Sequence, residues 1–278
     1  MNITKAHAYG NDFLLAPADR ASGDLPALAR DLCSRHKGIG ADGLVLYTLG
    51  ERGTATMRLL NADGSWSELS GNGLRCLAAF VARAHRLRPG MTVSIDSEAG
   101  VRTLDLLAWD PASRLDEASG VLSTRYEFRA AMGEPTEIRQ VQIDLPGETL
   151  TATVLRTGNP QCVVLGPLPT AERFNALGPA LSTHPMFPAG TNVEFVQVDA
   201  PDRVRMLIWE RGVGPTSSSG TGSTAAAVAA ASHGGAARSI DVMAPGGVQH
   251  VDWQDSGVYL TGWAELVFEG QWLGRPAH

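Results

Sequence analysis

The chain has 278 residues, of which 44% are hydrophobic and 19% charged, and its formal net charge at pH 7 is −6. This composition is typical of a soluble globular protein that is long enough for two domains. The acidic balance argues against a nucleic-acid-binding protein, which needs clustered Lys and Arg. Because no apolar run reaches about 18 residues and no apolar signal core follows Met1, we expect no membrane segment and a cytoplasmic location.

The cysteines and histidines are scattered. Cys33, Cys76 and Cys162 form no CxxC pair, so they indicate a reducing compartment and no disulfide framework. No two histidines stand at the spacing of paired ligands on a helix, so we expect no metal site.

Hydrophobic periodicity and turn signals predict an order of elements that occurs twice. The first series is a hairpin over 3–16 with its turn at Gly10-Asn11-Asp12, a helix over 25–36, strands over 44–47 and 54–60, a helix over 74–85, and strands over 92–95 and 101–108. A polar, turn-rich stretch at 111–120 is the best linker candidate. The second series is strands over 140–144, 151–157 and 161–165, a helix over 171–181, strands over 192–198 and 204–209, a helix over 223–232 closed by Gly234 and Gly235, a strand over 239–242, a hairpin around Gly257 and a strand over 264–268. We interpret this repetition as a diverged internal duplication of an α+β unit.

Two similar segments precede the second helix of each series. Ser70-Gly71-Asn72-Gly73 and Ser219-Gly220-Thr221-Gly222 each place a hydroxyl before a Gly-x-Gly turn. A helix N-terminus offers unpaired N–H groups and partial positive charge, so the pair suggests an anion site built from two similar halves. The simpler interpretation is that both serines are N-caps. No histidine stands near either serine in sequence, and the spacing is not that of a nucleophile elbow.

Polar residues gather at the predicted turns and strand ends. Turn chemistry explains any single asparagine, whereas five of them in both halves predict a polar pocket. Glu210-Arg211 follows an apolar strand and is either a surface ion pair or a clamp. In the clamp, Arg211 binds a carboxylate, and Glu210 binds an ammonium group or orients a neighbouring residue. The five asparagines are Asn11, Asn61, Asn72, Asn159 and Asn192.

Two cofactor classes can be weighed from the residues. Residues 220–225 match G-x-G-x-x-A with Asp241 further on, but no strand directly precedes them and no βαβ unit surrounds them. A dinucleotide-dependent oxidoreductase is therefore the weakest alternative. A pyridoxal phosphate enzyme needs a Schiff-base lysine, and only Lys5 and Lys37 are present, which favours a route without that cofactor.

Together these segments resemble the diaminopimelate epimerase family over nearly the whole chain. The resemblance implies two pseudo-symmetric α+β domains, each a mostly antiparallel sheet wrapped around a central helix, with the active site in the interdomain cleft. We expect an N-terminal domain over 1–115, joined by a C-terminal strand over 263–278, and a C-terminal domain over 116–262. The motifs are Tyr9-Gly10-Asn11-Asp12-Phe13, Gly38-Ile39-Gly40-Ala41-Asp42, Asn61-Ala62-Asp63-Gly64-Ser65, Gly71-Asn72-Gly73-Leu74-Arg75-Cys76, Gly158-Asn159-Pro160, Asn192-Val193 and Glu210-Arg211-Gly212-Val213-Gly214.

The resemblance also implies an isomerase that interconverts LL- and meso-2,6-diaminopimelate without a cofactor or metal, for lysine and peptidoglycan-precursor synthesis, as a homodimer. In this likeness Ser70 and Ser219 occupy the catalytic positions. The substrate would be held by Asn11, Asn61, Asn159, Asn192, Glu210 and Arg211, and its reacting carboxylate by Gly71, Asn72, Gly220 and Thr221.

The catalytic positions depart from the family, which has a cysteine at both. A thiol pKa of about 8.5 can be lowered by a helix end to suit proton transfer, whereas a serine hydroxyl is a far weaker acid. Gln161 also stands where the family usually has histidine, and Gly43 where many members have glutamine. Three accounts stay open: serines that work slowly or with help from Glu210, a homologue that binds an amino acid or catalyses another isomerisation, and replacement of both cysteines in the laboratory.

Overall fold

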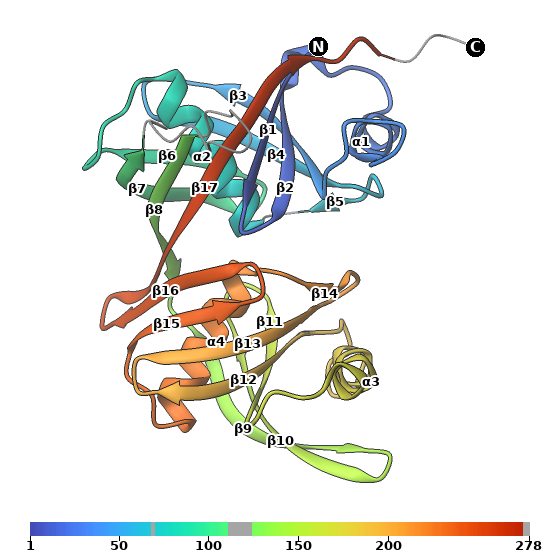
Figure 1. Ribbon diagram of the computed structural model, residues 1–278, viewed down its shortest axis with the longest axis vertical. Coiled ribbons are helices and arrows are strands. Elements are labelled where there is room, and N and C mark those ends of the chain that lie inside the picture. The colour runs from blue at the N-terminus through green and yellow to red at the C-terminus, as the bar shows by residue number, and fades with distance from the viewer. Residues whose placement is uncertain (68–69, 111–123, 275–278) are drawn as a thin grey trace, which may run out of the picture. The chain divides into compact units, whose positions relative to one another are not determined.

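The structure, a computed structural model, describes residues 1–67, 70–110 and 124–274. It is a mixed α/β protein with few helices and many strands (Figure 1), so the predicted α+β composition is confirmed at this level. The chain divides into two compact units, Met1–Ala130 with Gly262–His278, and Ala131–Thr261. The linker predicted at 111–120, and with it the predicted domain boundary at 115/116, lies outside the described residues.

The first unit is a sheet with two helices. Strand β8 (Thr124–Gly133) pairs with β7, and β17 (Gly257–Gln271) pairs with β1. The other elements, in chain order, are β1 (Asn2–Ala8), β2 (Asn11–Pro17), the 3-10 helix η1 (Ala18–Arg20), α1 (Leu25–Cys33), β3 (Gly43–Leu49), β4 (Thr54–Asn61), β5 (Trp66–Ser67), α2 (Gly71–Ala84), β6 (Thr92–Ser97) and β7 (Gly100–Asp110).

The second unit contains the same kinds of element. They are β9 (Thr136–Leu145), β10 (Glu148–Arg156), β11 (Pro160–Leu165), α3 (Ala171–Ser182), β12 (Asn192–Ala200), β13 (Arg203–Glu210), β14 (Gly214–Thr216), α4 (Gly220–His233), β15 (Ser239–Ala244) and β16 (Gly247–Gln254).

One series of strand pairings occurs in both units. In the first, β1–β2 is antiparallel, β2–β3 parallel, β3–β4 antiparallel and β4–β6 parallel. In the second, β10–β11, β11–β12, β12–β13 and β13–β15 follow the same sequence of directions. Each parallel pair is connected through a helix, as parallel neighbours require. This repetition is the topological counterpart of the duplication interpreted from the sequence.

In each unit the sheet curves around one helix, α2 or α4 (Figure 1), while α1 and α3 pack on the outside. Helix α4 contacts β10, β11, β12, β13, β15 and β16. Its residues 225–230 are five alanines and Val228, all at most 2% exposed. Such small side chains let the strands approach the helix from several sides, and the residues predicted to face the core on α2 (Leu74, Leu77, Ala78 and Val81) are likewise buried.

Several predicted boundaries were wrong. The first hairpin turns at Tyr9-Gly10, both with positive φ, and Asn11 already pairs with Ala8 in the ladder. The helices predicted from 74 and 223 begin at Gly71 and Gly220, because the turns that precede them are their first turns. The helix predicted to 36 ends at Cys33, and strands β5, β8 and β14 were not predicted, whereas the hairpin predicted around Gly257 is formed by β16 and β17. None of the helices in the described part of the chain is long and apolar enough to cross a bilayer.

Candidate active site

Both serines of the repeated segments are N-caps. The Ser70 hydroxyl accepts a hydrogen bond from the Gly73 N–H (3.2 Å), and the Ser219 hydroxyl accepts one from the Gly222 N–H (3.1 Å). The cap interpretation is therefore confirmed for both. A cap hydroxyl lies beside the backbone N–H groups of the first helical turn, which are the groups that can bind an anion at a helix end.

Two predicted site amides of the first unit contact each other. The Asn72 amide nitrogen donates to Asn11 Oδ1 (3.1 Å), and the Asn11 amide nitrogen donates to Asp42 Oδ2 (2.8 Å). Arg75 donates to Asn72 Oδ1, and its guanidinium lies over the Tyr9 ring. Arg75 is only 1% exposed, so this buried cation fixes which way the Asn72 amide points. The amide pair is thus oriented from both ends.

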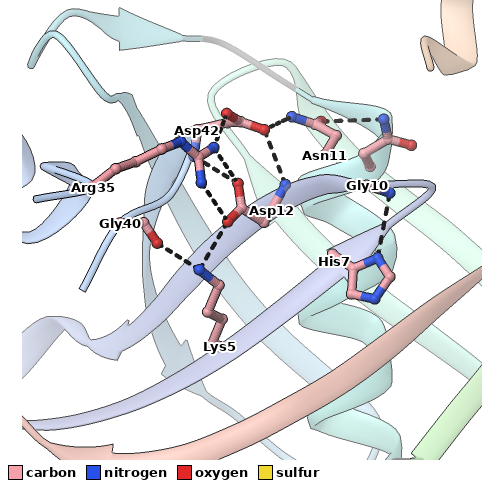
Figure 2. A network of polar contacts seen from close by, with 9 residues as sticks. Lys5, His7, Gly10, Asn11, Asp12, Arg35, Gly40 and Asp42 are labelled. Carbon is pink, nitrogen blue, oxygen red and sulfur yellow. Dashed lines mark hydrogen bonds and ion pairs between the residues drawn. The ribbon is translucent and has the colours of Figure 1, made fainter. Parts of the chain in front are cut away.

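Charged residues anchor the far end of this chain of contacts (Figure 2). Arg35 bonds both Asp12 (2.9 Å) and Asp42 (2.7 Å), and Lys5 pairs with Asp12 (2.8 Å) while donating to the Gly40 carbonyl. Burial by itself raises the pKa of Asp12, but hydrogen bonds from Arg35 and Lys5 outweigh it and hold that pKa at about 2. Asp12 is therefore ionised in the folded protein at all ordinary pH values.

We expect Asp12→Asn to lower the free energy of unfolding at pH 7 by about 1–2 kcal/mol, a value reduced to allow for the half-exposed Arg35. Since the folded-state pKa lies below the unfolded one, the stabilisation is present above about pH 4 and is lost as pH falls toward 2. Urea unfolding of the native chain and Asp12→Asn at pH 7 and at about pH 3, roughly midway between the two pKa values, measures this difference. A difference that stayed constant with pH would contradict the assignment.

Asn61 takes part in a local turn. Its amide nitrogen donates to Ser65 Oγ (2.9 Å) and its backbone N–H to the Ser65 carbonyl. Its side chain is exposed, and among the described residues it makes no hydrogen bond to Asn11 or Asn72. The structure thus brings Asn11 and Asn72 together and leaves Asn61 in its own loop.

In the second unit, Asn192 joins two loops. Its side-chain oxygen accepts from the Arg211 backbone N–H (2.9 Å), and its nitrogen reaches the Pro160 carbonyl (3.5 Å). The exposed Arg211 side chain donates a hydrogen bond to the Ala189 carbonyl (3.0 Å). This contact holds the guanidinium in place through a backbone group. Glu210, half-buried, is the last residue of β13, directly before Arg211.

Asn159 is tied to the first turn of α4. Gln161 donates to Asn159 Oδ1 (2.6 Å) and to Thr157 Oγ1 (3.3 Å), and Thr157 in turn donates to the Thr221 carbonyl (3.3 Å). Thr221 Oγ1 also lies 3.4 Å from Ser219 Oγ. Gln161, noted in the sequence only as a departure from the family, therefore holds a predicted site residue in place.

Sequence reasoning missed Arg75, Thr157 and Glu194 as parts of these clusters. Glu194 is fully buried on β12, and burial followed by the charge of Glu210 raises its pKa well above the usual value. The signal for Arg75 and Glu194 was a charged residue inside an apolar run. In the described residues, no three His, Cys, Asp or Glu side chains are grouped so as to hold a metal ion.

The solved structures that match this chain include proteins described as epimerases. A predicted epimerase from Pseudomonas aeruginosa matches with a TM-score of 0.70 at 15% identity, covering 99% of each chain. A hydroxyproline epimerase from Agrobacterium vitis matches with a TM-score of 0.60 at 17% identity, covering 98% of this chain and 89% of that one. These likenesses show that this chain shares the fold of the two epimerase structures.

The family profile described as diaminopimelate epimerase matches residues 3–119 and 138–267. The diaminopimelate epimerase of Desulfitobacterium hafniense is 37% identical over 280 residues, covering 97% of both chains, and that of Moorella thermoacetica is 39% identical over 277 residues, covering 97% and 98%. This chain belongs to the diaminopimelate epimerase family, a family of isomerases that work without pyridoxal phosphate. The dinucleotide alternative is left without support.

Proposed function

We propose that this chain binds 2,6-diaminopimelate and interconverts its LL and meso forms by exchanging the hydrogen at one α-carbon. The observation that carries the proposal is that both units present the same device, a serine-capped helix N-terminus with fixed asparagines linked to it or close by. The two units would act as two pseudo-symmetric domains that share one site in the cleft between them. The backbone N–H groups of Gly71, Asn72, Gly220 and Thr221 at the two helix ends would bind the reacting carboxylate.

The other substrate groups would be held by polar side chains from both units. Arg211 would bind the distal carboxylate through two parallel hydrogen bonds, and Glu210 would meet an ammonium group. The amide groups of Asn11, Asn61, Asn159 and Asn192 would complete the selection, because amides can both accept from ammonium and donate to carboxylate.

Ser70 and Ser219 would face opposite sides of the α-carbon, one removing the proton and the other returning it. A serine hydroxyl is poorly matched to this task, since proton transfer is most efficient when the pKa of the catalytic group lies near the working pH. We therefore propose a slow enzyme, helped by Glu210 as a base. The serines equally favour a second candidate, a homologue that binds an amino acid without turning it over.

Calorimetric titration and solvent exchange separate these candidates. The full chain should bind diaminopimelate, and NMR in deuterated water should show slow loss of its α-proton signal. Binding without any exchange would support the binding-only homologue. Tighter binding and faster exchange of a different amino acid would show that this scaffold serves another isomerisation.

We also propose that the protein is a cytoplasmic homodimer that acts in lysine biosynthesis, which rests on the family alone. Light scattering coupled to gel filtration measures the mass directly. A mass corresponding to one 29.4 kDa chain would contradict the dimer.

A further inference from the structure

Glu194 is a carboxylic acid in an apolar environment. It lies on β12, paired across the sheet with Val163 and Ile208, and all three residues are at most 1% exposed. Neither Glu194 oxygen has a hydrogen-bond partner among the residues that the structure describes. A buried, unpartnered carboxyl group costs folding free energy, and far more if it is ionised, so its retention needs a reason.

The position of the Glu194 carboxyl group supplies a reason for its retention. A Cβ atom added to Gly222 would lie 2.9 Å from Glu194 Oε1 and 3.2 Å from Ser219 Oγ. The carboxyl group therefore packs against the first turn of α4, on the inner side of the Ser219 cap. It shares the positive field of that helix end with any anion that binds from outside.

Burial and the charge of Glu210 favour the neutral form of Glu194 and oppose the positive field of the helix end, which favours the ionised form. Glu210 on β13 adds a like charge, Cys162 lies on β11, and the adjoining turn of α4 contributes only hydroxyl and backbone groups. Burial and then the charge of Glu210 raise the pKa of Glu194 well above its usual value, which favours the protonated form. A neutral Glu194 leaves the helix field to an external anion, whereas an ionised one would fill it with a resident negative charge.

We propose that Glu194 is a positioning residue that couples carboxylate binding at the α4 N-terminus to a proton, because a bound carboxylate and an ionised Glu194 exclude one another. This inference rests on the proposed function for the identity of the anion. Linkage makes the effect reciprocal: the bound carboxylate tightens the proton on Glu194, and ionisation of Glu194 weakens the carboxylate. Once Glu194 titrates, the Kd should rise by about tenfold for each pH unit if the ionised form does not bind.

The test is calorimetric titration of the full chain with meso-diaminopimelate at pH values from 5 to 9.5, a range that starts above the usual glutamate pKa of about 4.3. The native chain should lose affinity as pH rises, and Glu194→Gln, which is neutral at every pH, should lack this dependence. Titration of the ligand's own amino groups affects both proteins equally and cancels in the comparison. Glu148→Gln, at an ion pair with Arg173 on the surface of the same unit, is the matched control and should follow the native chain.

Unfolding without ligand gives an independent readout. Because the folded-state pKa of Glu194 is raised, the unfolded chain releases a proton that the folded protein keeps, so the native chain loses stability as pH rises above about 4.3. Glu194→Gln should therefore raise Tm, by more at pH 8 than at pH 5. If Glu194 had a purely structural role, Glu194→Gln would change Tm but would keep the pH dependence of the Kd. A variant that is more stable and whose Kd no longer depends on pH therefore supports the proposed coupling.

Two failures can be told apart. The same pH dependence of Kd in Glu194→Gln and the native chain, or an equal Tm at every pH, would overturn this inference alone. Absence of diaminopimelate binding at every pH would overturn the proposed function and this inference together.

Discussion

Restoring cysteine at both helix ends, as Ser70→Cys with Ser219→Cys, should raise the rate of α-proton exchange in diaminopimelate by about 10²- to 10⁴-fold. The reason is the proton affinity of the two groups. A thiol has a pKa of about 8.5, and a helix N-terminus can lower it further, so a usable fraction is thiolate near neutral pH. The same helix end cannot bring a serine hydroxyl into that range. NMR in deuterated water, on the native and double-variant chains side by side, measures the ratio.

The stability of the double variant should move the other way. Both hydroxyls cap a helix, and a poorer cap costs about 0.5–2 kcal/mol at each end. Ser239→Cys, at an exposed position on β15, is the matched control for the reaction and should leave the exchange rate unchanged. A double variant that folds and binds diaminopimelate but exchanges no α-proton would contradict the proposed epimerase chemistry.

Arg211→Lys should weaken diaminopimelate binding by about 10- to 100-fold, since one bidentate contact with a carboxylate carries roughly 1.5–3 kcal/mol. Lysine keeps the positive charge but presents a single ammonium point in place of the planar fork. It also loses the geometry by which the guanidinium reaches the Ala189 carbonyl. Calorimetric titration gives the Kd of both proteins.

The control is Arg173→Lys, an exposed arginine of the same unit that pairs with Glu148. It should leave the Kd unchanged. Since Arg211 is exposed, its replacement should not alter Tm, so weaker binding cannot be attributed to unfolding. Equal affinity of Arg211→Lys and the native chain would remove Arg211 from the substrate site.

Local sequence signals were sufficient for most elements of the fold. The apolar stripe of α2 and the alternation in β4 follow from periodicities of 3.6 and 2 residues, which need no knowledge of distant partners. The start of each central helix was placed three residues late, because glycine-rich first turns look like loops. The Ser70 and Ser219 caps marked the true starts.

The contacts within each cluster were harder to predict. Asn11, on β2, and Asn72, on α2, are 61 positions apart in the chain. Their amides meet only because the folded sheet packs around α2. The roles of Arg75 and Glu194 could not be predicted from the sequence for another reason. Burial of a charged side chain runs against the usual distribution of residues, and only the packed structure reveals its neighbours.

The alanine-rich surface of α4 affects how well the N-terminus of this helix can stabilise a negative charge that forms during a reaction. The buried segment 225–230 of α4 carries only alanine side chains and Val228, and the helix contacts six strands. Because these side chains are short, they cannot rearrange to let the helix slide or tilt. Its terminal amide dipoles are aimed before any ligand arrives, so no reorganisation is required when charge accumulates beside them. Stabilisation of that kind is an inherited property of the scaffold, independent of which residue handles the proton.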